Sequence, residues 1–137
     1  PGEAPAPLGR IASGGELSRL MLAVKRVIAA ADPVGTYIFD EVDTGVGGAV
    51  AEAIGRKLHE VARHHQVVCI THQAVIAAWA DHHLVVHKEV VDGRTRTSIR
   101  ALTDDERHLE LARMMGGADL TPGVHQAARE LLSGARS

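Results

Sequence analysis

The sequence of 137 residues has very few aromatic side chains and a single cysteine. Only Tyr37, Phe39 and Trp79 are aromatic, which excludes the kind of aromatic platform on which single-stranded bases stack. Because Cys69 is alone, the chain forms no internal disulfide and no zinc site built from several cysteines, which fits a reducing compartment. Leu, Val, Ile and Ala must therefore supply most of the core.

Long apolar runs and an excess of one charge are also missing. No apolar stretch approaches the ~20 residues that span a bilayer, and residues 1–10 lack the charged start and apolar segment of a signal peptide. We therefore expect a cytoplasmic protein with no membrane partner. The formal net charge of −2 gives no overall basic signal for nucleic acid, so DNA contacts are expected from a local patch or from outside this chain.

Apolar periodicity in the first half predicts alternating helices and strands. An amphipathic helix is predicted over 16–31, with Ser18 and Arg19 mostly outward, and a buried strand over 37–39. A second helix is predicted over 50–63 and a second buried strand over 67–70. The inner face of the second helix would consist of Val50, Ile54, Leu58 and Val61. This order is typical of a mainly parallel sheet flanked by helices. The sequence therefore predicts an α/β fold, and we expect the whole chain to form one compact unit.

The second half continues with a short helix over 74–80 and a hairpin near residues 83–101 that turns at Asp92-Gly93. Two further helices are predicted within 103–132, and Thr103 begins the first of them with a capping box. The proline-rich and glycine-rich residues 1–10 are predicted to be an extended opening loop.

Ser13, Gly14 and Gly15 stand directly before the first predicted helix. The free N–H groups and the positive dipole at a helix N-terminus favour an anion, such as the terminal phosphate of a nucleotide. The alternative is that Ser13 only caps the helix and that the glycines only form a turn.

Acidic residues and a histidine follow the two predicted strands. Asp40 and Glu41 lie where α/β proteins place ligands, and Asp43 adds a third acid. Asp40 suits Mg²⁺ held through its water shell, while Glu41 suits the orientation or deprotonation of an attacking water. His72 follows the second strand in the same way, so in a parallel sheet it would approach the same ligand. The alternative is a set of solvated acids and a structural histidine.

Other candidate residues are less specific. Cys69 lies within a buried strand and is expected to be a core residue rather than a nucleophile. Arg94, Arg96 and Arg100 alternate along one strand of the hairpin and would share a face. They could contact DNA phosphates, and the alternative is a solvated edge that discourages aggregation.

In this order, the motifs resemble those of a known family. The start of segment 11–31 resembles the signature motif of ABC-type ATPase heads. Its wording is that of the RecN family, a family of SMC-like bacterial DNA repair proteins. Segment 37–48 is similar to the Walker B and D-loop stretch of that family, and segment 67–72 to its strand and H-loop. Shorter similarities extend the resemblance over nearly the whole chain, at residues 1–3, 111–117 and 128–132.

The resemblance implies an ATP and Mg²⁺ site shared by two heads. Its roles would fall on seven residues: Ser13, Gly14 and Gly15 on the γ-phosphate of nucleotide held by the opposite head, Asp40 on Mg²⁺ through water, Glu41 as the catalytic base, Asp43 in the D-loop across the dimer interface, and His72 on the γ-phosphate. The implied partners are an N-terminal P-loop lobe of the same protein, a second head by homodimerisation, and DNA through the full-length protein. The implied setting is recombinational repair of double-strand breaks in the nucleoid.

Two features depart from the family pattern. After His72 the family continues with Leu-Pro-Gln, whereas this chain has Gln73-Ala74-Val75. No segment matches the P-loop, Gly-x-x-x-x-Gly-Lys-Ser/Thr, which holds the β- and γ-phosphates. The resemblance therefore implies that the chain is the C-terminal lobe of a split head and that it starts within the loop that follows a coiled coil. We expect such a lobe to be inactive alone. The alternatives are a non-catalytic interaction module or the head lobe of another SMC-like protein.

Overall fold

The computed structural model describes residues 13–91, 93–117 and 119–135. Its contacts divide the chain into two compact units, of which the first ends at Trp79 and the second begins at Ala80. The sequence pattern predicts one unit, whereas the contacts give two. The predicted opening loop, residues 1–10, lies outside the described residues.

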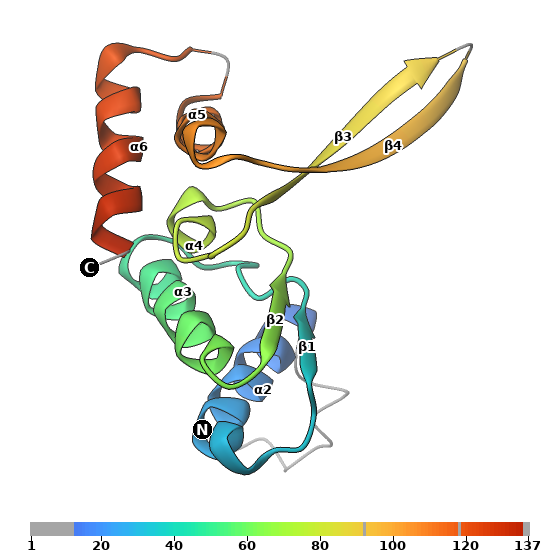
Figure 1. Ribbon diagram of the computed structural model, residues 1–137, viewed down its shortest axis with the longest axis vertical. Coiled ribbons are helices and arrows are strands. Elements are labelled where there is room, and N and C mark those ends of the chain that lie inside the picture. Colours follow the sequence, from blue (N-terminus) through green and yellow to red (C-terminus); the bar gives the residue numbers. More distant parts are fainter. Residues whose placement is uncertain (1–12, 92, 118, 136–137) are drawn as a thin grey trace, which may run out of the picture. The chain divides into compact units, whose positions relative to one another are not determined.

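The first unit contains two parallel strands and the helices around them (Figure 1). Its elements are α2 (Gly14–Ile28), the short 3₁₀ helix η1 (Ala29–Ala31), β1 (Thr36–Phe39), α3 (Gly48–Ala62), β2 (Gln66–Cys69) and α4 (Ala74–Ala77). Thr36 is opposite Gln66 and Phe39 is opposite Cys69, so the two strands end at the same edge. The predicted α/β order and the parallel pairing are confirmed.

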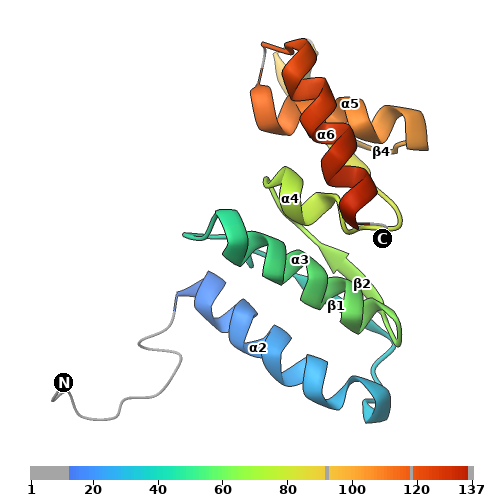
Figure 2. The ribbon, with the colours of Figure 1, turned by 90° about the vertical axis from the view of Figure 1, so that its left-hand side faces the viewer.

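The core of the first unit lies between the sheet and the two long helices, which run beside each other (Figure 2). Tyr37 and Phe39 of β1 join Leu22 of α2 and an apolar row of α3 in one buried cluster. That row consists of Ala51, Ile54, Leu58 and Val61. The predicted inner face of α3 is therefore confirmed from Ile54 onward, while Val50 is exposed.

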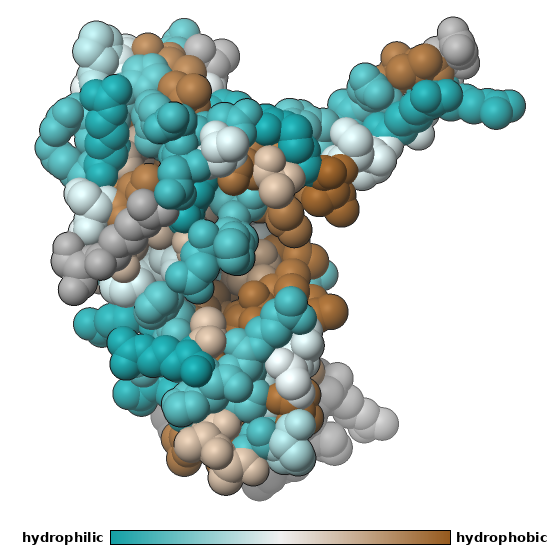
Figure 3. Space-filling view, viewed as in Figure 1, coloured by the Kyte–Doolittle hydropathy of each residue, from teal (hydrophilic) through white to brown (hydrophobic). Residues whose placement is uncertain are grey.

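Only one face of this sheet is buried. Because side chains alternate along a strand, Ile38 points away from Tyr37 and Phe39, and it is 70% exposed. Val68 and Ile70 are also exposed, and Figure 3 shows hydrophobic surface around the two strands. The prediction of buried strands is therefore wrong for this second face, because no described element of the first unit covers it.

The apolar stripe of α2 is likewise largely uncovered. Leu22 is buried, but six other apolar side chains are 41% to 81% exposed: Leu17, Leu20, Met21, Val24, Val27 and Ile28. The helix is amphipathic as the sequence predicts, and no described element of the first unit covers most of its apolar side.

The second unit consists of a hairpin and two helices. These are β3 (Leu84–Val91), β4 (Arg94–Ala101), α5 (Asp104–Gly116) and α6 (Pro122–Ala135). The strands are antiparallel, with Leu84 opposite Ala101, which confirms the predicted hairpin. Gly93 has φ +72° at the turn, while Asp92 lies outside the described residues. The predicted capping box at Thr103 is present.

Arg107 is a buried charged residue in the second unit. It is 2% exposed, and its guanidinium donates hydrogen bonds to the backbone carbonyls of Ala80 and Asp81. A buried arginine is tolerated when its N–H groups are paired. The start of the second unit is thereby fixed to α5, near the buried Leu111.

Candidate functional site

The residues after β1 and those after β2 meet at one edge of the parallel sheet. Oδ2 of Asp43 accepts hydrogen bonds from Thr71 Oγ1 at 2.5 Å and from the His72 N–H at 3.0 Å. Nδ1 of His72 lies 3.1 Å from the same oxygen. The Asp43 side chain is 4% exposed, whereas that of His72 is 79% exposed. The structure therefore brings His72 to the acidic segment, as the parallel sheet predicts.

Asp40 directly follows β1 and is exposed. Its Oδ1 accepts a hydrogen bond from the Glu41 N–H at 2.9 Å. Mg²⁺ retains most of its waters and needs few protein carboxylates. An exposed carboxylate at a strand end, with one oxygen engaged by backbone, fits a Mg²⁺ ion held through water.

Glu41 lies against the start of α2 in the same chain. Its φ of +57° is in the left-handed region, which few residues with a side chain adopt. A Cβ added to Gly14 would lie 2.5 Å from Glu41 Oε2, and a Cβ added to Gly15 would lie 2.7 Å from the Glu41 backbone oxygen. Both glycines therefore permit a close approach between the helix start and the acidic turn.

Ser13 caps α2, which is the alternative to anion binding that the sequence left open. Its hydroxyl accepts from the Glu16 N–H, and the Glu16 carboxylate accepts from the Ser13 N–H at 2.8 Å. This second bond is the main reason that the pKa of Glu16 lies below its usual value. The N–H groups of Gly14 and Gly15 have no acceptor within the helix, so the same helix start can also receive an anion.

Two side chains that sequence reasoning placed outward join α2 to the acidic turn. Ser18 Oγ donates to the Asp40 carbonyl at 2.7 Å, and Arg19 Nη1 donates to the Thr44 carbonyl at 2.9 Å. The outward placement was wrong, because Ser18 and Arg19 lie one turn after Gly15, on the side of the helix that approaches Glu41. That three- and four-residue spacing was the available sequence signal.

Cys69 is next to this site but is chemically quiet. Burial, together with the nearby carboxylates of Asp43 and Asp40, raises the pKa of the thiol to about 12. A thiol with so high a pKa is not a nucleophile at neutral pH, which agrees with its predicted place in the core.

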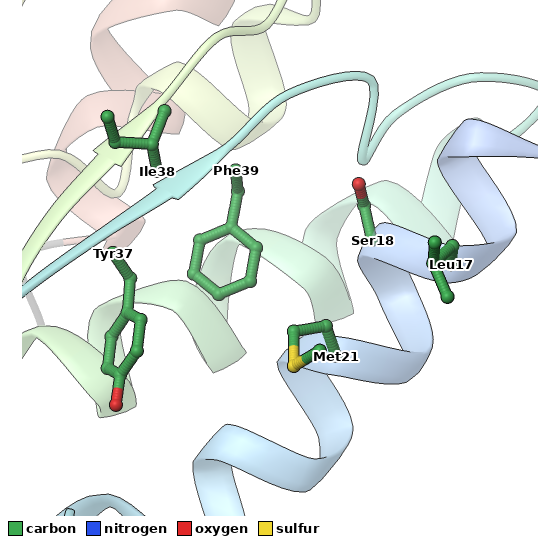
Figure 4. A pocket seen from close by; sticks show the side chains of 6 residues that line it. All are labelled: Leu17, Ser18, Met21, Tyr37, Ile38 and Phe39. Atoms are coloured by element: carbon green, nitrogen blue, oxygen red, sulfur yellow. The ribbon is translucent and has the colours of Figure 1, made fainter. Parts of the chain in front are cut away.

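An open apolar hollow lies between α2 and β1. Figure 4 shows the side chains around it, which are Leu17, Ser18, Met21, Tyr37, Ile38 and Phe39. Ser18 supplies the only polar side chain apart from the hydroxyl of Tyr37. The hollow is therefore suited to receiving apolar side chains rather than a phosphate.

The three arginines of β4 share a face, as the alternation predicts. The strand register places Glu89 opposite Arg96, and Arg100 forms an ion pair with Glu106 at 2.6 Å. These acids offset part of the positive charge around Arg94, Arg96 and Arg100, so the arrangement favours a solvated edge.

In the described ranges, no helix combines the length and apolar character of a membrane span.

Comparison with known proteins gives one consistent family, although no family model matches the chain. It is 47% identical over 137 residues to the DNA repair protein RecN of Halalkalibacterium halodurans and 51% identical over 134 residues to that of Deinococcus radiodurans. These alignments cover 100% and 98% of the chain. This chain belongs to the RecN family. It spans about a quarter of the length of these relatives, 24% and 23% respectively.

A solved structure agrees with this assignment at the level of the fold. The RecN-family chain matches a structure from work on ATP-driven dimerization and DNA-stimulated activation of SMC ATPases, with a TM-score of 0.53 and 23% identity. The match covers 80% of this chain and 66% of the other. The predicted fold class, an α/β lobe with the fold found in SMC-type ATPase heads, is confirmed.

Proposed function

We propose that this chain is the C-terminal lobe of the ATPase head of a RecN-type protein that acts in recombinational repair of DNA double-strand breaks. The observation that carries the proposal is the convergence of Asp40, Glu41 and His72 at one edge of the parallel sheet, beside the helix start that carries Gly14 and Gly15. The relatives bear the name DNA repair protein RecN, which supports the setting in repair.

At this edge each residue has a distinct task. Glu41 is the catalytic base that removes a proton from the attacking water. The exposed imidazole of His72 contacts the γ-phosphate of ATP. Asp40 holds the water shell of Mg²⁺, which when bound neutralises charge on the phosphates.

The helix start acts on a second nucleotide site. Ser13, Gly14 and Gly15 offer a hydroxyl and two backbone N–H groups to the γ-phosphate of nucleotide bound by the opposite head of a homodimer. Asp43 belongs to the D-loop at that interface. Because its own carboxylate is buried, it reaches the partner through the exposed turn that follows it.

A P-loop lobe must complete the site, because this sequence has no P-loop. The uncovered apolar face supports such a partner: Ile38, Val68 and Ile70 form one exposed side of the sheet, next to the stripe of α2. We propose that the N-terminal lobe of the same protein covers this face. DNA contacts, and a place in the cytoplasm at the nucleoid, then belong to the full-length protein.

The decisive experiment is Glu41→Gln in the full-length protein. The amide keeps the shape of the side chain but cannot take a proton, so ATP hydrolysis should fall by about 10²-fold or more while ATP binding persists. Heads that bind ATP without hydrolysing it should accumulate as dimers, which chemical cross-linking and size-exclusion chromatography detect.

Glu52→Gln is the matched control, because Glu52 is an exposed glutamate on α3. It should leave hydrolysis and dimer formation unchanged. Loss of ATP binding in a folded Glu41→Gln protein would contradict the assigned role. Turnover by the 137-residue chain alone, abolished by Glu41→Gln, would contradict the need for a P-loop lobe.

A further inference from the structure

Oδ2 of the buried Asp43 carboxylate receives its hydrogen bonds from the segment that carries His72. That oxygen receives the Thr71 hydroxyl and the His72 N–H, and it contacts His72 Nδ1. Burying an ionised carboxylate is costly unless such donors are present. The same oxygen therefore binds the backbone N–H of His72 and lies beside its ring.

Gln73 adds a second connection between the same two segments. Its Nε2 donates to the carbonyl of Asp43 at 3.1 Å and to the carbonyl of Val46 at 2.7 Å. Its backbone N–H donates to Thr71 Oγ1 at 3.0 Å, so the hydroxyl that serves Asp43 also shapes the loop. A leucine at this position would have no group that could make the two side-chain bonds.

We propose that Asp43 and Gln73 form a latch that positions His72 for the γ-phosphate and joins it to the turn over residues 43–46. This inference rests on the proposed function, in which His72 contacts the γ-phosphate. Asp43 is a positioning residue, since it acts through His72. Gln73 is the residue that closes the loop after His72 onto this turn.

The latch fixes which ring nitrogen of His72 carries the proton. In neutral imidazole one nitrogen donates and the other accepts. A proton on Nδ1 suits the 3.1 Å approach of this nitrogen to Asp43 Oδ2, and Nε2 is then the ring nitrogen that can accept. Because the turn over 43–46 shares the latch, a movement of that turn is passed directly to His72.

The first test is the tautomer of His72 in the 137-residue chain, read by ¹⁵N nuclear magnetic resonance of the neutral ring. The Nδ1–H form should predominate in the wild type and should be lost in Asp43→Asn, whose amide lacks the negative charge. Asp119→Asn, at an exposed aspartate of the second unit, is the control and should leave the signal unchanged. An unchanged His72 tautomer in Asp43→Asn would overturn the latch.

Gln73→Leu tests the other half and keeps the carboxylate, so it remains informative if Asp43→Asn does not fold. It should preserve the Nδ1–H tautomer. Hydrogen exchange of the Thr44 N–H, which is bonded to the Glu41 carbonyl at 3.1 Å, should accelerate about tenfold because the turn loses two bonds. Unchanged exchange would remove Gln73 from the proposal.

In the full-length protein, Asp43→Asn should lower kcat for ATP hydrolysis by about 10- to 100-fold, since a misplaced ligand can cost two orders of magnitude. Binding of ADP, which lacks the γ-phosphate, should be unchanged. An unaltered kcat, with the His72 tautomer lost, would overturn the positioning role. If Glu41→Gln leaves hydrolysis intact, the proposed function fails, whereas the tautomer still decides the latch.

Discussion

Gly14 and Gly15 are neighbours at the start of one helix, yet the structure predicts opposite results for their replacement by alanine. A Cβ at Gly14 would meet the carboxylate end of Glu41, a flexible side chain that can rotate away. A Cβ at Gly15 would lie 2.7 Å from the Glu41 backbone oxygen and 3.0 Å from Thr44 Cβ. These atoms belong to the turn itself and cannot move separately from it.

The size of the difference follows from two opposing effects. Alanine gains up to about 1 kcal/mol over glycine in a helix, and this gain is similar at both positions because they are adjacent. Overpacking against a fixed neighbour costs about 1–3 kcal/mol. The free energy of unfolding of Gly15→Ala should therefore lie about 1–3 kcal/mol below that of Gly14→Ala, which should equal or slightly exceed that of the wild type.

Urea unfolding followed by tryptophan fluorescence measures this difference in the correct unit, because the single tryptophan, Trp79, belongs to the first unit. For an m-value of about 2 kcal/mol/M, the midpoints of the two variants should differ by about 0.5–1.5 M. If Gly15→Ala unfolds at the same or a higher urea concentration than Gly14→Ala, the close approach to Glu41 is not the reason that glycine occupies position 15.

Two further predictions concern charged groups. Ion pairs with Arg26 and Lys57 hold the pKa of Glu60 down at about 2, so its contribution to stability is present above the unfolded pKa near 4.5 and is lost as the pH falls through about 2. Glu60→Gln should therefore lower the urea midpoint at pH 7 more than at pH 3, and an equal loss at both would refute the assignment. Arg107→Leu should lower the stability of the second unit by about 2–3 kcal/mol in hydrogen exchange, because two carbonyls lose their charged donor, while Arg129→Leu at an exposed site of α6 should cost under about 0.5 kcal/mol. Equal losses of stability in these two variants would show that the buried hydrogen bonds of Arg107 do not stabilise the second unit more than an exposed arginine does.

The secondary structure could be predicted well because its signals are local. The spacing of Ile54, Leu58 and Val61 predicts a helix with one inner face, and the Thr103 cap is visible in four residues. The meeting of the acidic segment with His72 followed from one topological step, since parallel strands carry their ends to one edge. That step needed no knowledge of side-chain contacts.

The predictions that failed or were missed depend on contacts with segments that are distant in the sequence. Periodicity shows that Ile38 is apolar but not whether another element covers it, and no described element of the first unit does so. The bonds from Ser18 and Arg19 to the turn depend on a close approach between segments more than twenty residues apart. The two bonds of Gln73 likewise depend on where the 43–46 turn lies, which no pattern around residue 73 encodes.

The one-sided burial of the β1–β2 sheet bears on how such a protein is made. An apolar face that is left open favours association with any other apolar surface, including a second copy of the same chain. Under the proposed function, the P-loop lobe is translated first and is already folded when β1 leaves the ribosome. The order of synthesis would then protect the apolar face, because the folded P-loop lobe can cover the sheet as soon as the sheet forms.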